Sequence, residues 1–433
     1  MIRAILLGGI LCIALPRPPL EAQLGRTAQV VTPTDTVRLT IAAARSRALA
    51  QNPSFLAALE SVTAAQGDLR TAGTYPYNPL AEAEGPGVLT EGRGRYEARL
   101  GQEIEWAGQR GLRLGAARAG LRATSSRTLD EARRLLGEVE AAFVSMAAAQ
   151  ERYRLAEEIE DLNRRLVEAV RVELGEGEVS VLEANLVEIE AARARARVLE
   201  AGRAVATANL ALRRLMGLDP GPVIRVEADP SLSVADGDAD IMVAAALEAR
   251  PDLEAARSQV EEARSLQSLA TRAALPNLRV SGIVEGEGGG ADPRFGVALS
   301  LPVPLFDRNQ GLRLRREAEV DRSRFDAGAT AIRVRTEVLD AVQTYRASVR
   351  ELAIYRSDIL EPVRRNQGLL DTAYREGKLD LSSLLLLRNQ LLDAELGYWE
   401  AWERHRRAAV AVRTATSAVL DDTALDLPSE DLR

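Results

Sequence analysis

The chain has 433 residues and a formal net charge of −7, with one cysteine, Cys12, and one histidine, His405. A single cysteine excludes disulfides within the chain and thiolate metal sites, and a single histidine cannot form a histidine cluster. Nearly every positive charge is an arginine, with Lys378 the only lysine, and no basic block points to nucleic acid. We therefore expect no catalysis, no metal site, no cofactor and no nucleic-acid partner.

Residues 1–22 are typical of a secretory signal peptide. An apolar stretch follows Arg3 and ends before a small-residue site near Ala22, and it is too short to span a membrane. The alternative, a lipid anchor on Cys12, is disfavoured because Leu11 precedes it where a small residue is expected. No later run reaches the roughly 18 apolar residues of a transmembrane helix, so a membrane role would require strands.

An internal repeat relates the two halves of the chain. The segment Gly111–Leu114 recurs as Gly311–Leu314, an offset of 311 − 111 = 200 residues. Four more pairs share this offset, namely Trp106 with Phe306, Pro76 with Pro276, Ile159 with Ile359, and Gly177 with Gly377. Five landmarks in one register indicate two copies of one structural unit.

Each unit predicts the same order of elements: a helix, a pair of short strands, a very long helix, a glycine-containing break and another helix. The first unit is 39–217, with elements at 39–72, 79–106, 108–174, 175–179 and 180–217. The second unit is 240–419, with elements at 240–273, 277–305, 309–375, 376–380 and 381–419. Residues 218–239, rich in Pro, Asp and Gly, are predicted to be an equatorial connector, and 420–433 an acidic flexible tail.

Heptad spacing is the strongest signal in the long helices. It runs through Leu129, Ala132, Leu136, Val139 and Phe143 and has a counterpart in the second unit, where Pro362 is expected to cause a kink. Each long helix could extend over about 65 residues, or roughly 100 Å. The two shorter helices of a unit together match this length, so we expect them to stack end to end along the long one. Periodicity alone fits a soluble helical scaffold equally well.

The strands favour a membrane channel over a scaffold. Residues 95–106 and 294–305 alternate apolar side chains with others, which is the period of a strand. With a weaker partner before each and a Gly-rich loop within each pair, the chain has four predicted strands. Four strands in lipid would leave unpaired backbone edges, and membrane barrels need at least about eight strands, so the barrel must be shared between chains. The residues expected to face lipid are Tyr96, Leu100, Ile104, Trp106, Phe295, Val297 and Leu299. A small soluble sheet that caps the helices is the alternative.

Three segments resemble the TolC-like outer-membrane efflux protein family. Leu39–Pro53 is similar to the family's first helix, Leu275–Leu278 to its strand entry, and Leu301–Gly311 to its strand-to-helix junction in the form common in the heavy-metal (CzcC-like) branch. The resemblance implies a mainly α fold with a small β part: a homotrimer with a 12-stranded transmembrane β-barrel, continued by a long α-helical periplasmic barrel. It also implies an outer-membrane channel in a tripartite efflux system of the RND type, with metal cations as cargo suggested by the branch.

The same resemblance implies a passive exit duct whose partners are outer-membrane lipid, a periplasmic adaptor protein and an inner-membrane efflux pump. The alternative function is a soluble exported coiled-coil scaffold without channel activity. The adaptor is expected to dock at the two helix breaks, because glycine lets a helix reverse tightly and an exposed turn leaves side chains free for a partner. The docking residues implied are Gly175, Gly177, Glu178, Gly377, Lys378 and Leu379.

Gly175 has no counterpart in the second unit, which leaves open whether both tips engage the adaptor equally. The family also implies a periplasmic entrance narrowed by acidic residues, since a ring of carboxylates favours cations. The candidates are Asp371, Glu376 and Asp380. The alternative for each is a solvated charge at an exposed helix end.

Overall fold

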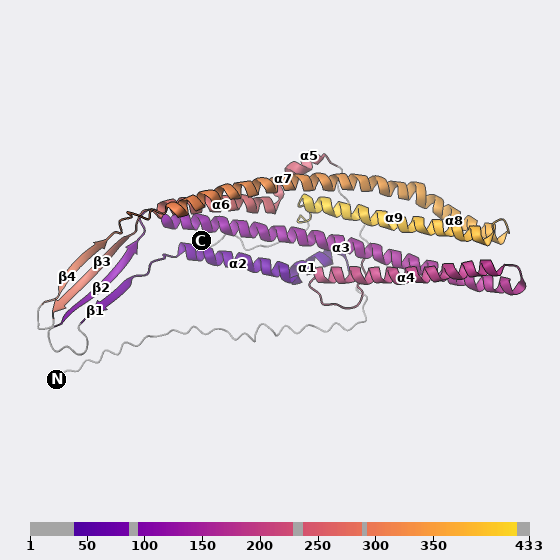
Figure 1. Ribbon diagram of the computed structural model, residues 1–433, viewed down its shortest axis with the longest axis horizontal. Helices are drawn as coiled ribbons and strands as arrows, with labels where there is room; N and C mark the ends of the chain where they lie inside the picture. The colour runs from indigo at the N-terminus through magenta and orange to yellow at the C-terminus, as the bar shows by residue number, and fades with distance from the viewer. Residues whose placement is uncertain (1–38, 86–93, 228–236, 288–291, 422–433) are drawn as a thin grey trace, which may run out of the picture. The chain divides into compact units, whose positions relative to one another are not determined.

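A computed structural model describes residues 39–85, 94–227, 237–287 and 292–421 (Figure 1). The expected signal peptide and most of the expected acidic tail lie outside the described residues, as do the centres of both Gly-rich loops.

The chain is mainly helical with one antiparallel sheet of four strands. The helices of the first half are α1 (Ile41–Gln51), α2 (Pro53–Gly73), α3 (Gln109–Glu176) and α4 (Val181–Leu215). Those of the second half are α5 (Ala239–Ala249), α6 (Pro251–Arg272), α7 (Gln310–Ile354), the π-helical turn η2 (Tyr355–Leu360), α8 (Glu361–Arg375) and α9 (Leu381–Ala415). The strands are β1 (Leu80–Glu84), β2 (Arg95–Ile104), β3 (Leu278–Glu287) and β4 (Arg294–Ser300).

The predicted helices 39–72 and 240–273 are wrong in one respect, because each is two helices. The residues before Pro53 and Pro251 adopt extended conformations, as a following proline favours. Asn52 and Arg250, which occupy the two breaks, also bind the last helix of their own half. Asn52 Nδ2 donates to the carbonyl of Leu215 at 2.9 Å, and Arg250 Nη1 donates to that of Ala415 at 3.4 Å.

The helices form a layer of four columns (Figure 1). The first column is α2 and α4, both packed along α3, which is the second column; the third is α6 and α9, and the fourth is α7, η2 and α8. α3 also packs on α6 and α9, so the two halves are joined between the second and third columns. The predicted stacking of shorter helices along each long one is confirmed.

The sheet follows the same order as the columns. Its strand order is β1-β2-β3-β4, with every neighbouring pair antiparallel. In the chain β1 follows α2, β2 precedes α3, β3 follows α6 and β4 precedes α7. The two edge strands, β1 and β4, therefore connect to the two outermost columns.

Both strands that were predicted to be long end earlier than expected. β2 stops at Ile104 and β4 at Ser300. Pro302 and Pro304 have no N–H to donate to a ladder, which explains the end of β4. Trp106 lies just beyond β2, where its Nε1 donates to the carbonyl of Pro276 at 2.9 Å.

The second long helix is interrupted where Pro362 was expected to kink it. The chain forms the π-helical turn η2 immediately before this proline, whose missing N–H leaves the Asp358 carbonyl without its usual helical partner. The Tyr355 ring in this turn lies against Gly397 of α9, where an added Cβ would come within 2.9 Å of the ring. The two columns thus approach closely at the interruption.

The main hydrophobic cluster lies where α1, α3 and α4 meet the connector, and it includes Phe55, Phe143 and Leu212. A buried ionic group borders it. The fully buried Glu140 carboxylate lies 3.4 Å from Arg45 and 3.6 Å from Arg413. These contacts join α1, α3 and α9, and hence the two halves of the chain.

Candidate functional site: the sheet face and the helix tips

One face of the sheet carries no charged residue. Directly paired residues share a face, and the register aligns Leu100 with Gly282 and Gly282 with Val297. Leu100 and Phe295 of this face are 62% and 80% exposed. Six of the seven residues predicted to face lipid lie on it, the exception being Trp106: Tyr96, Leu100, Ile104, Phe295, Val297 and Leu299.

The opposite face of the sheet is charged, with both signs. Arg95 and Glu285 pair across β2 and β3 at 2.6 Å, and Arg279 lies 3.4 Å from Glu103 across the same strands. The sheet is therefore amphipathic across its whole width, apolar on one side and ionic on the other.

The junction between sheet and helices is held by hydrogen bonds. The Tyr75 hydroxyl donates to the Glu103 carbonyl at 2.8 Å and accepts from the Glu105 N–H at 2.9 Å. Arg113 binds the Glu105 carboxylate through two N–H groups at 2.5 and 2.9 Å, and this hydrogen bonding raises the pKa of Arg113 although burial opposes it. The contacts fix the angle at which α3 leaves the sheet.

Left-handed residues start both long helices. Gly108 precedes α3 with φ +77°, and Asn309 precedes α7 with φ +59°. Asparagine is among the few side-chain-bearing residues that tolerate this region. In the junction Asp-Arg-Asn-Gln-Gly, the asparagine is therefore the residue that must adopt the left-handed backbone conformation.

Both helix tips turn in the same way. Gly177 and Gly377 adopt φ +78° and +67°. The N–H of Glu178 donates to the carbonyl of Glu173, and that of Lys378 to Ala373, each at 2.9 Å, as in a Schellman motif.

The helices that leave the two tips are capped by side chains. Ser180 forms a capping box with Glu183 at the start of α4, and this hydrogen bonding from Ser180 lowers the pKa of Glu183. Asp380 accepts from the N–H of Ser383 at the start of α9, at 3.2 Å. The predicted break 175–179 is therefore shifted, because Gly175 lies in the last turn of α3 and only Gly177 makes the reversal.

The two tips share one small core, which we call the tip cluster: Val170, Ala184, Val187, Leu381, Leu384 and Leu385. Val179 and Leu379, one from each turn, are half-buried against it. Among the predicted docking residues, Glu178 and Lys378 are exposed, whereas Leu379 helps to hold the two tips together.

A hydrogen bond that the sequence did not predict also links the tips. The Tyr374 hydroxyl of α8 donates to the Glu173 carboxylate of α3 at 3.3 Å. Burial, followed by the charge of Glu173, raises the pKa of Tyr374. In the sequence, Tyr374 stands among the apolar residues of the heptad pattern. That position indicates a buried side chain, but it does not indicate Glu173 as the partner.

The predicted entrance acids have local partners where their side chains are described. Glu376 lies 2.6 Å from Lys378, and Asp380 caps α9. Asp371 lies on α8, and its side chain is outside the described residues. Among the described residues, no group of three or more His, Cys, Asp or Glu side chains could hold a metal ion.

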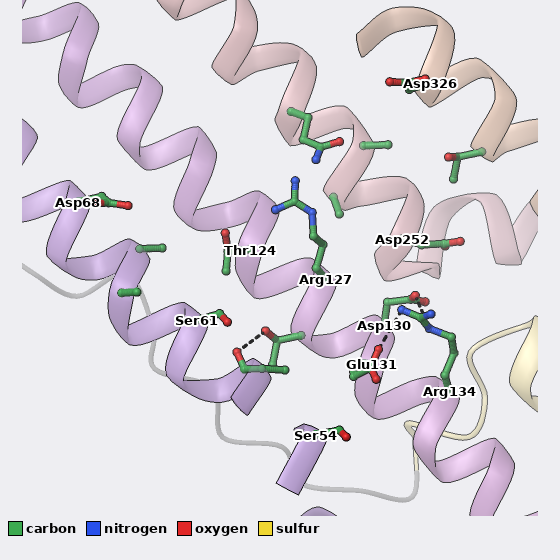
Figure 2. Close-up of a pocket in the computed structure, with 18 residues that line it drawn as sticks. Ser54, Ser61, Asp68, Thr124, Arg127, Asp130, Glu131, Arg134, Asp252 and Asp326 are labelled. Atoms are coloured by element: carbon green, nitrogen blue, oxygen red, sulfur yellow. Dashed lines mark hydrogen bonds and ion pairs between the residues drawn. The ribbon is translucent and has the colours of Figure 1, made fainter. Parts of the chain in front are cut away.

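A hollow of about 670 Å³ lies on one face of the helix layer, lined by α2, α3, α6 and α7 (Figure 2). Five acidic residues and two arginines line it: Asp68, Asp130, Glu131, Asp252, Asp326, Arg127 and Arg134. Arg134 lies 3.0 Å from both Asp130 and Glu131 (Figure 2). Burial would raise the pKa of Asp252, but hydrogen bonds and charge from Arg250 outweigh it and lower this pKa. The hollow is thus an acidic surface to which all four columns contribute.

Residues 242–418 match the sequence model of the family described as Outer membrane efflux protein. This matched segment, which makes up most of the second half of the chain, belongs to the family. The outer membrane efflux proteins are channels rather than enzymes, and the prediction that the chain has no catalytic activity is confirmed. Among the residues that the structure describes, no helix combines the length and the apolar character that a membrane span requires.

Several known proteins are similar to this chain. The cobalt-zinc-cadmium resistance protein CzcC of Cupriavidus metallidurans is 24% identical over 387 residues, which cover 86% of this chain and 89% of CzcC. The solved structure of CusC has a TM-score of 0.73 at 17% identity, covering 88% of this chain and 92% of that one. VceC from Vibrio cholerae has a TM-score of 0.72 at 16% identity, covering 87% and 95%. The TolC-like fold that the sequence predicts is confirmed by these likenesses.

Proposed function

We propose that the protein is one subunit of a homotrimeric exit duct in the outer membrane, with its helices in the periplasm. One observation carries this proposal: the two unpaired edge strands of the sheet are connected to the two outermost columns of the helix layer. β1 and β4 are the free edges of the sheet, and they lead from and to the two outermost columns. Unpaired backbone groups in lipid cost several kcal/mol each, so β4 of one copy would pair with β1 of the next.

Three copies of four strands supply twelve, above the minimum of about eight for a membrane barrel. The number three rests on the family resemblance. The uncharged face of the sheet is suited to lipid, with Leu100 and Phe295 as its most exposed large side chains on β2 and β4. The ionic face is suited to a water-filled lumen.

The helix tips are the proposed docking site for a periplasmic adaptor, which would connect the duct to an inner-membrane pump of the RND type. Glu178 and Lys378 are exposed at equivalent positions of the two turns, and the turns share one geometry. Equal engagement of both tips is therefore favoured over the asymmetry that Gly175 suggested. Asp371, Glu376 and Asp380 remain candidates for the acidic entrance.

The duct would convert no energy, and its gate would be a shift between two packings of the tips. The 24% identity to CzcC over most of both chains favours metal cations as the cargo. A passive conduit receives its specificity from the pump, so cargo is a property of the whole system.

Membrane fractionation and a semi-native gel test the duct. We expect the protein in the outer-membrane fraction, extracted only by detergent, and migrating as three chains until it is heated. Complete recovery from the soluble periplasm without detergent would refute the proposal and support the soluble scaffold.

Cargo is tested separately in a strain that lacks the protein but keeps the pump and adaptor. Accumulation of cobalt, zinc or cadmium is measured beside that of an organic dye. If deletion raises the cellular content of the dye but not of any of the metals, the metal assignment is wrong while the duct stands.

A further inference from the structure

The fourth column presents an apolar face to which no other part of the described chain packs. α7 packs on α5, α6 and α9 through buried residues such as Val334 and Val338. Phe325, Ile332 and Leu339 lie on the other side of the helix at heptad intervals, and Phe325 and Ile332 are 76% and 63% exposed. A heptad stripe of this kind is the pattern of a helix that packs on another helix.

The first column presents a face of the opposite character. α2 packs on α3 through the buried Phe55 and Val62. On the other side of α2 the residues at helical spacing are small: Ala57, Ala64, Gly67 and Thr71. An added Cβ at Gly67 would meet nothing within 4 Å, although a glycine inside a helix costs about 1 kcal/mol relative to alanine.

We infer that these two faces form the seam between neighbouring copies, with the Phe325 stripe of α7 packed on the small-residue face of α2 of a second copy. The inference rests on the proposed oligomeric duct and names the residues that close it. Large side chains on one helix and small ones on the other allow a close approach of the two backbones. The occupant is a second copy because the two faces lie at opposite ends of one layer, which gives a head-to-tail contact that can close into a ring.

The two faces also lie at similar distances along their helices, counted from the end next to the sheet. α2 ends at Gly73 just before β1, and α7 begins at Gln310 just after β4, so the two helices run in opposite directions. At the helical rise of about 1.5 Å per residue, Ala57 lies about 24 Å before the end of α2 and Phe325 about 22 Å after the start of α7. The two positions are therefore at nearly the same distance from the ends of their helices that face the sheet.

Charges match at the next turn. By the same helical rise, Glu60 lies about 20 Å before the end of α2 and Arg322 about 18 Å after the start of α7. Both side chains are exposed, and Arg322 also lies 3.7 Å from Asp326 of its own helix. The same pair of copies would join β1 to β4, so the helical seam continues the strand pairing of the proposed barrel.

Disulfide trapping tests the seam in the full-length protein. Two differently tagged versions are co-expressed in a Cys12→Ser background, one with Ala57→Cys and the other with Phe325→Cys. We expect a reducible band that carries both tags. The matched control replaces Ala57→Cys by Thr71→Cys, which moves the thiol about 21 Å along α2. The first pair should cross-link at least tenfold more than the control, and equal yields would overturn the inference.

A semi-native gel of the same samples separates the seam from the duct. Trimers in the outer membrane without cross-linking of the matched pair would leave the proposed function intact and refute the seam. Absence of trimers in the cysteine-free parent would refute both. As a second measure, Gly67→Phe should lower the temperature at which the trimer dissociates, whereas Gly67→Ala should change it little. An unchanged dissociation temperature for Gly67→Phe would also count against the seam.

Discussion

Replacement of Gly377 by valine should loosen the second tip without affecting assembly. Gly377 ends α8 with φ +67°, a region that costs an ordinary L residue about 1–2 kcal/mol and a β-branched residue more. An added Cβ at this position would meet nothing within 4 Å, so the cost comes from the backbone alone. A penalty of about 1–2 kcal/mol changes a local equilibrium by a factor of about 5–30.

Amide hydrogen exchange measures this change directly. The N–H of Lys378 donates to the carbonyl of Ala373 only while the turn is formed. Its exchange should become about 5–30 times faster in Gly377→Val. Gly377→Asn is the matched control, because asparagine tolerates the left-handed region, and it should stay close to the parent.

The functional consequence is measured as efflux in cells that contain the pump and adaptor. We expect Gly377→Val to reduce efflux and Gly377→Asn to retain most of it, with trimers formed equally by both. Two results would refute the reasoning. If Lys378 exchanges equally fast in both variants, the backbone argument is wrong, and if exchange differs while efflux does not, the tip has no part in coupling.

Three further predictions concern buried or linking side chains. Arg250→Met should destabilise the protein by up to about 3 kcal/mol in thermal unfolding, because it removes the buried guanidinium that binds the largely buried Asp252 carboxylate and leaves only the exposed Arg333 beside it, whereas Arg333→Met should cost under about 1 kcal/mol. Asp252 has a lowered pKa in the folded state, so its stabilising effect is complete above its ordinary pKa of about 3.9 and is lost as the pH falls through the lowered value; Asp252→Asn should reduce the slope of stability against pH in acid denaturation. Tyr374→Phe should remove the hydrogen bond to Glu173 and speed amide hydrogen exchange in α8. Unchanged exchange in α8 would show that this hydrogen bond does not stabilise the tip.

The repeat explains why so much of the fold was predictable. Periodicity determines which faces are apolar, and two copies of one pattern supply independent evidence for each element. The corresponding ends Leu215 and Ala415 each accept a hydrogen bond from the break residue of the same half. The breaks themselves were missed, although Asn52-Pro53 and Arg250-Pro251 are plain in the sequence, because a proline at the first turn of a helix also fits a helix that merely begins there.

The site was predictable only where local chemistry determines it. Gly177 and Gly377 were found because a left-handed turn requires glycine. The link between Tyr374 and Glu173 and the tip cluster could not be found, since they depend on how helices distant in sequence pack. The end of β4 could have been predicted, because Pro302 and Pro304 have no N–H to donate to a β-ladder. It was missed because the alternation of apolar side chains continues beyond Ser300, where the strand ends.

The two halves of the chain differ in their long helices. α3 runs unbroken from the sheet to the first tip, whereas the corresponding column of the second half is interrupted by η2. A π-helical turn shifts its hydrogen bonds by one residue and often marks a functional site. The Tyr355 ring on Gly397 keeps the columns close there, while the tip cluster and the Tyr374 link join the tips. The proposed gating movement at the tips would thus have a bending point at η2 in the second half and none in the unbroken α3 of the first, and the hairpin of α8 and α9 is the part expected to move.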